Sequence, residues 1–530
     1  MAARAGRAAI TVAPGTAVMR KSLRFIVLSA VRASLVCALC AAPVATTFAE
    51  PPRFALAHHS VSTPNTNAQR EFDEGLTLIY AFNPEEATFH FQAAARSDSR
   101  LAMAYWGIAL AAGPNVNTIY DLRRAAIGRA AIAQAQSLPA SLAERRYIAA
   151  LAHRYTAQND AQVFPAQVAY ADAMRALVRS DASDIDARVL CAESLMDLTP
   201  LDMWHGAQPN SYTREVIGLL QTALARDPDQ LGANHYLIHA YEDAPDPQAA
   251  LGAARHLATL DLPPGAEHLA HMPAHIFIRV GDFNAAIRAS LRAIALFSRY
   301  LPQEHSDVHN GYEHHDYQVL GFAYAMSGQW SKARANAAVI AQQVNDSGAA
   351  VETYLRFHKW RELIALPAPA QPGLRYRFAL ALAMANTHDL GPARVLIAAI
   401  DIAHDAEPRT RIARAQLAAA IDIAEHHPDA AIGELKHAVI FEDGLPSKEP
   451  PAWYYPIRET LGARLALAGK PREAAAVFDE DLKRNPNNPR SLFGLSQALR
   501  SIDRTRAARA ASAFHAAWLH ADLQLTLNDL

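Results

Sequence analysis

The polar and apolar residues of this chain recur at helical intervals, and the strict alternation typical of strands is hard to find. Near the C-terminus, Leu492, Leu495 and Leu499 are separated by three and four positions, which places them on one face of a helix. Alanine and other strong helix formers outnumber runs of β-branched residues. The pattern predicts an all-α protein.

A second pattern, of large and small residues, repeats with a period near 34 residues. Leu461 and Gly462 stand side by side and are followed by Leu465, Ala474 and Phe478. These residues match positions 7, 8, 11, 20 and 24 of the tetratricopeptide repeat, in which the small side chains lie where two helices approach closely. The match predicts a hairpin of two helices at this point of the chain.

The same spacing is found elsewhere, so we expect a tetratricopeptide-like α-solenoid of stacked helix-turn-helix repeats. Two further matches are Leu320-Gly321 with Tyr324, Gly328 and Ala333, and Gly75 with Ala87, Phe91, Ala94 and the following Trp106-Gly107. A proline-rich segment at 366–373 interrupts the array. We expect this linker to join two lobes, an N-terminal one over 50–365 and a C-terminal one over 374–530.

The first 49 residues have the layout of a secretory signal peptide. Arg20, Lys21 and Arg24 form a basic patch, a mostly apolar segment follows over 33–45, and Ala49 ends a region of small residues where cleavage is expected. We therefore expect an exported protein, periplasmic or secreted. No later stretch is long enough to span a membrane, so we expect no membrane association after cleavage.

Charge and motifs narrow the classes of partner. The formal net charge is -2 at pH 7, which gives no general basic character for binding nucleic acid. The sequence contains no glycine-rich phosphate loop, no G-x-S-x-G motif of hydrolases and no H-E-x-x-H motif of zinc proteases. We expect neither a nucleotide cofactor nor a nucleic-acid partner, whereas a protein or peptide partner fits a repeat groove.

Histidines concentrate between residues 235 and 315, where the repeat register places them at equivalent positions. With repeats beginning at 231, 267 and 314, positions 2, 5 and 9 of three successive first helices hold six of them: His235, His239, His268, His271, His275 and His315. Similarity to tetratricopeptide proteins implies that these positions, with positions 12 and 13, line the concave groove. Glu242 and Arg279, at positions 12 and 13, would join the histidines there.

Such a cluster has the chemistry of a transition-metal site. His235 with His239, and His271 with His275, are spaced i, i+4, so each pair lies on one face of a helix. Ligand sets rich in nitrogen favour zinc, copper, iron or nickel over calcium or magnesium. The sequence therefore predicts a divalent transition metal, with zinc, copper and iron as the main candidates.

Three other residues bear on this prediction. Glu242 and Asp316 are candidates to bind the metal or to orient the imidazoles through hydrogen bonds. Pro273 lies inside the expected helix and cannot donate a backbone hydrogen bond. If Pro273 instead begins a helix, His268 and His271 precede that helix and only His275 stays on the expected face.

Several sequence blocks are shared with known proteins. They are AMAYWGIAL at 102–110, HYLIHAYED at 235–243, HLAHMPAHIFIRVG at 268–281, WYYPIR at 453–458 and FDEDLKRNPNNPRSLFGLSQAL at 478–499. On these blocks the chain resembles a group of exported bacterial tetratricopeptide-repeat proteins. The resemblance implies the repeat fold and no particular reaction.

The chain departs from this group at two places. Relatives commonly have His or Asp where this chain has Gln318, so the site is altered here if that position supplies a ligand in them. Many relatives read Asn-His-Glu-Glu where this chain reads Asn-Pro-Glu-Glu over 83–86.

Three functions remain compatible with these residues. The first is an exported metal-binding protein with the six histidines as ligands; it would be an enzyme only with an open coordination position beside an acid or base such as Glu242 or Asp316. The second is a metal-free scaffold whose groove binds a peptide or protein. The third is a pH-responsive binding module, because imidazoles titrate near neutrality.

Overall fold

The computed structural model describes residues 54–303, 305, 312–344, 348–400, 407–445 and 450–530. The predicted signal peptide at 1–49 lies outside these residues and stays a prediction. The described residues are mostly helical, and their one sheet pairs the short antiparallel strands β1 (Trp204–His205) and β2 (Gln208–Pro209).

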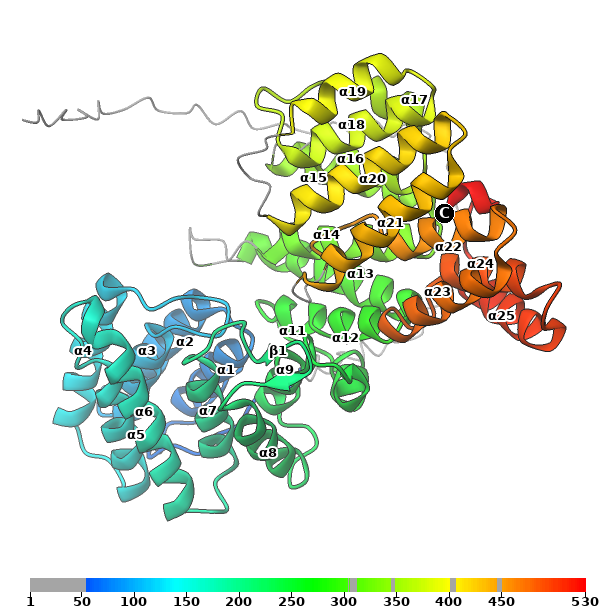
Figure 1. Ribbon diagram of the computed structural model, residues 1–530. Coiled ribbons are helices and arrows are strands. Elements are labelled where there is room, and N and C mark those ends of the chain that lie inside the picture. Colours follow the sequence, from blue (N-terminus) through cyan, green and yellow to red (C-terminus); the bar gives the residue numbers. More distant parts are fainter. Residues whose placement is uncertain (1–53, 304, 306–311, 345–347, 401–406, 446–449) are drawn as a thin grey trace, which may run out of the picture. The chain divides into compact units, whose positions relative to one another are not determined.

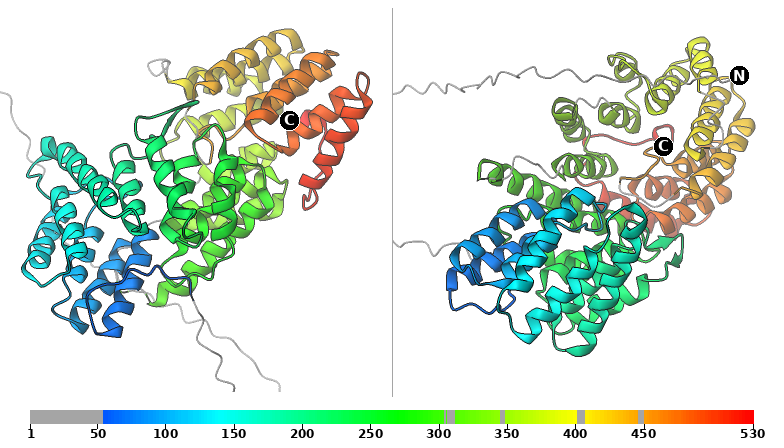
Figure 2. Two further views of the ribbon diagram at one scale, coloured as in Figure 1. Left: turned by 90° about the horizontal axis from the view of Figure 1, so that it is seen from below. Right: turned by 90° about the vertical axis from the view of Figure 1, so that its left-hand side faces the viewer.

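The helices follow one another through short connections, and consecutive helices lie side by side in the views of Figures 1 and 2. The first group is α1 (Thr66–Tyr80), α2 (Pro84–Ser97), α3 (Ala102–Ala111), α4 (Leu122–Ser137), α5 (Leu142–Arg154), α6 (Asp160–Ser180), α7 (Ile185–Met196), α8 (Thr213–Leu224), α9 (Leu231–Tyr241), α10 (Leu251–Leu257), α11 (Glu267–His271), α12 (Pro273–Arg279) and α13 (Phe283–Tyr300). The second group is α14 (Tyr312–Met326), α15 (Trp330–Val344), α16 (Gly348–Arg356), α17 (Trp360–Ile364), α18 (Leu374–Asn386), α19 (Leu390–Ala398), α20 (Pro408–Ala424), α21 (Pro428–Asp443), α22 (Ile457–Leu467), α23 (Pro471–Arg484), α24 (Pro489–Leu499) and α25 (Arg504–Ala517). Short 3-10 helices are η1 (Pro247–Ala250), η2 (Leu301–Gln303) and η4 (Leu527–Asp529).

The repeat register explains how these hairpins pack. The ring of Phe478 on α23 lies against Gly462 on α22 and Gly494 on α24. A Cβ atom placed on either glycine would lie 2.5 or 2.2 Å from the ring carbon Cζ of Phe478, so only glycine admits the ring there. The large residue of one hairpin therefore fills the space left by small residues on the helix before it and the helix after it.

The same arrangement recurs near the start of the described chain. The ring of Phe91 on α2 lies between Gly75 on α1 and Gly107 on α3, where added Cβ atoms would come within 2.8 and 2.4 Å of it. These are the residues that the sequence places at equivalent positions of the repeat. The all-α, tetratricopeptide-like fold is confirmed.

Buried apolar residues form three clusters along the array. The first cluster draws on residues 57–357, the second on 351–455 and the third on 412–530. The second contains Leu363, before the proline-rich segment at 366–373, and Phe378, after it. The described residues belong to one compact unit, and the division into two lobes stays a prediction.

A buried polar network connects the later repeats. The guanidinium of Arg356 donates two hydrogen bonds to the Glu459 carboxylate, at 2.5 and 2.8 Å. The Asn488 amide donates to Glu459 and to Asp481, both at 2.8 Å. Arg490 donates to the backbone carbonyls of Ala325 and Arg356. We use the name Arg356–Glu459 network for the set Arg356, Glu459, Asp481, Asn488 and Arg490.

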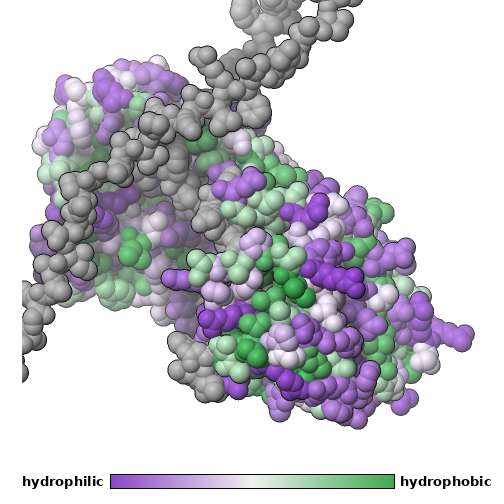
Figure 3. Space-filling model, turned by 90° about the horizontal axis from the view of Figure 1, so that it is seen from above, coloured by the Kyte–Doolittle hydropathy of each residue, from purple (hydrophilic) through white to green (hydrophobic). Residues whose placement is uncertain are grey.

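The surface of the described residues mixes polar and apolar side chains. Figure 3 shows hydrophilic and hydrophobic residues interspersed over the face in view. None of the described helices is both long and apolar enough to cross a membrane.

Candidate metal centre

Helix α9 carries the first two histidines of the cluster. Its start is fixed by Gln230, whose side chain accepts a hydrogen bond from the backbone N–H of Ala233. His235 and His239 follow one turn apart, so their rings leave the same face of the helix, with centroids 4.8 Å apart.

The segment around Pro273 carries three more. Pro273 is the first residue of α12. A backbone N–H at this position would have no partner within the helix, so a proline costs no hydrogen bond there. His268 and His271 therefore lie on the preceding short helix α11, and only His275 lies on α12, as the alternative reading of Pro273 required. Met272 keeps helical dihedral angles (φ -51°, ψ -36°), so His271 and His275 still approach each other across the junction.

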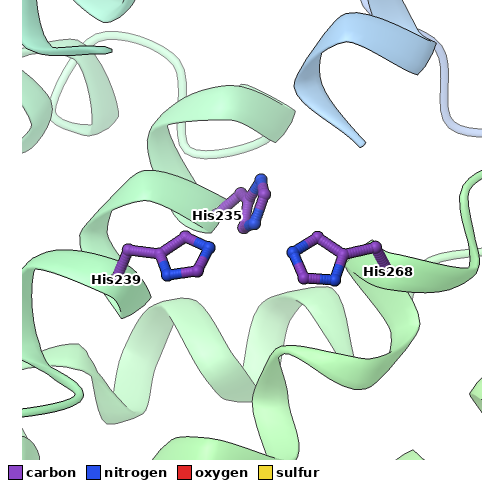
Figure 4. Close-up of side chains that lie close together, drawn as sticks. All are labelled: His235, His239 and His268. Carbon is purple, nitrogen blue, oxygen red and sulfur yellow. The ribbon is translucent and has the colours of Figure 1, made fainter. Parts of the chain in front are cut away.

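The first group of three histidines, the first triad, consists of His235, His239 and His268. Figure 4 shows two rings from α9 and one from the facing segment converging on one point. Ring centroids are 4.8, 4.9 and 5.9 Å apart, and one ring nitrogen from each residue lies within 4.8 Å of the other two. At this separation the three ring nitrogens can serve as ligands of one metal ion.

The second triad consists of His271, His275 and His315, which comes from α14. Its ring centroids are 4.7, 4.9 and 5.3 Å apart, and its ring nitrogens also lie within 4.8 Å of one another. The Nε2 atoms of His271 and His275 are only 2.9 Å apart. The six residues singled out in the sequence thus come together as two neighbouring groups of three.

These histidines lie deeper than the expected groove surface. The exposed fraction is 0% for His235 and His271, 2% for His268, 5% for His239 and 7% for His275, and His315 is partly buried. The cluster therefore lies in the interior of the repeat array. Packed helices and neighbouring aromatic rings cover it.

Burial controls the protonation of the rings. It lowers the pKa of His235, His268 and His271 well below the ordinary histidine value, and neighbouring imidazoles lower the pKa further. The pKa of His315 is lowered in the same way by burial and then by His271. These rings are neutral at pH 7, which is the form that binds metal ions.

Protein groups orient several rings through Nδ1. The Nδ1 atom of His235 lies 2.7 Å from the carbonyl oxygen of Tyr80, and that of His239 lies 2.9 Å from Glu242 Oε1. The Nδ1 atom of His271 lies 2.7 Å from Asp316 Oδ1, but the two atoms do not form a hydrogen bond. The hydrogen bonds at His235 and His239 hold the proton on Nδ1 and direct the Nε2 lone pair of each of these two rings inward. Glu242 and Asp316 thus lie where the sequence analysis placed them, beside the rings.

The inward-facing nitrogens lack partners within the described part of the chain. The Nε2 atoms of His235 and His239 and both ring nitrogens of His268 are buried there without a hydrogen-bond partner. A buried polar atom left in this state costs about 1–3 kcal/mol. Several such atoms facing one another require a partner that is not part of the protein chain, such as a water molecule or a metal ion.

Glu242 lies beside both triads. Its Oε1 atom contacts His239 of the first triad, and its Oε2 atom is 3.9 Å from Nδ1 of His275 in the second. Burial acts to raise the pKa of Glu242, but the electrostatic attraction and hydrogen bond of His239 outweigh burial and lower this pKa below its ordinary value. Arg279 holds this end of α9 by donating to the backbone carbonyls of Glu242 and Ala244.

Two aromatic residues that the sequence analysis did not single out complete the site. The ring of Phe82 lies 4.5 Å from that of His235 and stacks on those of His239 and His268 at 5.5 and 5.3 Å. Tyr312 stacks on His268 at 4.2 Å. Phe82 directly precedes the Asn-Pro-Glu-Glu segment at 83–86, which was the one sequence signal near it.

Gln318 lies beside two consecutive histidines of α14. Its Nε2 atom lies 2.9 Å from Nε2 of His314, which is outside the triads. Its side chain also interacts with His315, so this position borders the second triad.

Comparison with known proteins adds little to this description. No protein-family model matches the chain, and no curated protein is similar to it. A crystal structure of Ypp1 is 9% identical and matches 87% of this chain and 82% of its own, with a TM-score of 0.45. Yeast Tom70 is 12% identical over 86% of this chain and 92% of its own, with a TM-score of 0.27.

The tetratricopeptide-repeat domain of P58(IPK) is 13% identical over 83% of this chain and 99% of its own, with a TM-score of 0.19. At such TM-scores these likenesses say nothing about what the chain binds. The description of the fold rests on the helices and their packing, and that of the site on its own residues.

Proposed function

We propose that this chain is an exported tetratricopeptide-like protein that binds a divalent transition metal through its histidine cluster. The observation that carries the proposal is the set of buried Nε2 atoms in the first triad, which face one another without a partner in the described chain. The proposed ligands are the six histidines of the two triads; Glu242 orients His239 through a hydrogen bond, and Asp316 lies beside His271.

The chemistry of the donors selects the class of metal. Neutral imidazoles suit zinc, copper and iron, whereas calcium and magnesium require a majority of oxygen ligands. Burial favours the neutral form of the rings, so little protonation competes with a metal at pH 7. A bound ion would supply the electron-pair acceptor that the inward-facing nitrogens lack.

Metal analysis of the chain, purified without a histidine tag, tests this proposal. We expect zinc, copper or iron in the purified protein, or stoichiometric uptake after treatment with a chelator and reconstitution. The double variant His239→Ala with His271→Ala removes one ligand from each triad and should lose the metal.

A matched double variant controls for the loss of any two histidines. His437 and His515 are exposed and lie on α21 and α25, so His437→Ala with His515→Ala should bind metal like the unaltered chain. A folded, unaltered chain that stays free of metal after reconstitution contradicts the proposal and leaves the peptide-binding scaffold as the better function.

Export is the second part of the proposal. The basic patch and apolar segment before Ala49 support it. Expression of the full chain in a Gram-negative host should yield a periplasmic product whose mass corresponds to cleavage after Ala49. Recovery of uncleaved protein from the cytoplasm alone would contradict export.

A further inference from the structure

The two triads are built to one plan. In each, a pair of histidines spaced i, i+4 comes from one repeat, and the third histidine comes from the next repeat. In the repeat register, His235 and His239 occupy positions 5 and 9 and His268 occupies position 2 of the following repeat. The second triad repeats these positions with His271, His275 and His315.

Repetition of the helical unit has therefore duplicated a ligand set. Each junction between successive repeats brings positions 5 and 9 of one repeat against position 2 of the next, and both triads gather their ring nitrogens within 4.8 Å. One ion bound by all six rings would require them to converge on one point, whereas the structure gathers them in two groups of three. The neighbouring groups meet where His268 and His271 stack, with ring centroids 6.0 Å apart.

We infer that the centre holds two divalent transition-metal ions, one in each triad, with Glu242 connecting the two sites. This inference rests on the proposed function and adds the number of ions and their arrangement. Each ion would receive three imidazole nitrogen ligands, which would leave at least one position of a tetrahedral ion open to water or another small ligand.

Glu242 has the contacts of a connecting residue. One carboxylate oxygen contacts His239 in the first triad, and the other faces His275 in the second at 3.9 Å. A carboxylate that lies beside both triads would reduce the mutual repulsion of two nearby cations. Glu242 is thus a positioning residue for both ions.

Metal titration distinguishes two ions from one. Chelator-treated protein titrated with Co²⁺ should bind two ions per chain. His239→Ala should remove only the first-triad ion and His315→Ala only the second, so each variant should bind one. One ion per chain in the unaltered protein, lost in both variants, overturns the inference and leaves the proposed function intact. An unaltered protein that binds no ion contradicts the proposed function instead.

Electron paramagnetic resonance gives a test that needs no variant. Protein loaded with two equivalents of Cu²⁺ should show spin–spin coupling, seen as broadening and a half-field signal or as integrated spin below the copper content. An uncoupled signal from one bound Cu²⁺ per chain overturns the inference.

The variants used in the titration need a folding control. Circular dichroism of each variant establishes that its helices are formed before its metal content is compared.

The connecting role of Glu242 has its own test. Glu242→Gln should weaken the binding of both Co²⁺ ions about 10- to 100-fold, because groups that orient ligands contribute on this scale. Glu473→Gln, at an exposed position of α23, should weaken neither. Weakening of only one ion would show that Glu242 serves a single site and does not connect the two.

Discussion

Two buried polar clusters of this protein meet the requirements of burial in opposite ways. In the Arg356–Glu459 network the chain supplies both the charge and its counterpart, since the Arg356 guanidinium meets the Glu459 carboxylate through two hydrogen bonds. In the first triad the chain supplies only imidazole nitrogens with lone pairs. The Nε2 atoms of His235 and His239 have no hydrogen-bond partner among the described residues.

The difference lies in what each cluster lacks. The Arg356 guanidinium and the Glu459 carboxylate neutralise each other's charge within the fold, although Arg356 Nε has no hydrogen-bond partner among the described residues. Imidazole lone pairs that face one another need an electron-pair acceptor, and burial disfavours the proton as that acceptor because it lowers the pKa of His235 and His268. A metal ion is the acceptor that fits a set of nitrogen atoms. The two clusters therefore differ in charge: the network contains oppositely charged groups that pair with each other, whereas the triad gathers like groups that share no partner within the described chain.

The largest effect on the free energy of unfolding should come from breaking the Arg356–Glu459 network. Arg356→Ala leaves the buried Glu459 carboxylate without its counterpart, and we expect it to lower the free energy of unfolding by about 3–5 kcal/mol. Guanidinium unfolding followed by circular dichroism measures this change. Arg506→Ala, which removes an exposed partner of Asp479, should change stability very little. A small loss for Arg356→Ala would show that the network does not hold the later repeats together.

A smaller effect on the free energy of unfolding should come from adding Zn²⁺ to the histidine triads. Zn²⁺ at about 100 times its dissociation constant should raise the free energy of unfolding by about 2.7 kcal/mol, because the ion binds the folded chain alone. Unfolding curves with and without Zn²⁺ measure this gain. The double variant His239→Ala with His271→Ala should show no gain, whereas Arg356→Ala should show the full gain. Equal stabilisation of the double variant would place the zinc elsewhere.

The smallest effects concern the packing on which the Arg356–Glu459 network rests. Gly462→Ala brings a methyl group against the ring of Phe478, one turn from Glu459, and should cost about 1–3 kcal/mol. Gly433→Ala, in the middle of α21 with open space at its Cβ, should instead stabilise by about 0.5–1 kcal/mol. Thermal unfolding of both variants measures the pair. Equal shifts in the two variants would argue against the close contact at Gly462.

Much of the fold was open to prediction because the repeat leaves a local signature. The glycines at 75, 107, 462 and 494 are required by the close approach of a phenylalanine ring, and that requirement recurs at a fixed spacing. The six histidines could be found for the same reason, since each occupies an equivalent position of the repeat. The effect of Pro273 was foreseen only as an alternative, because the sequence did not determine whether a helix ends or continues at Met272.

The rest of the site depends on contacts that leave no local pattern. Phe82 reaches three imidazoles from a different hairpin, and its backbone takes a positive φ of 55°, which is unusual for a residue with a large side chain. The carbonyl of Tyr80 that orients His235 is a backbone atom and has no signature at all. The depth of burial likewise depends on the packing of distant hairpins, so the sequence suggested a groove where the structure has an interior.

The contact between Tyr80 and His235 joins positions 155 residues apart, and this separation bears on when the centre can form. Closing so long a loop requires the intervening helices to be in place, so the first triad is oriented late in folding. An ion that needs this triad can be captured only after the hairpins at α1 and α9 have met. In a chain that crosses a membrane unfolded, the metal would then be chosen from the ions of the compartment where folding finishes, whatever the supply where the chain is made.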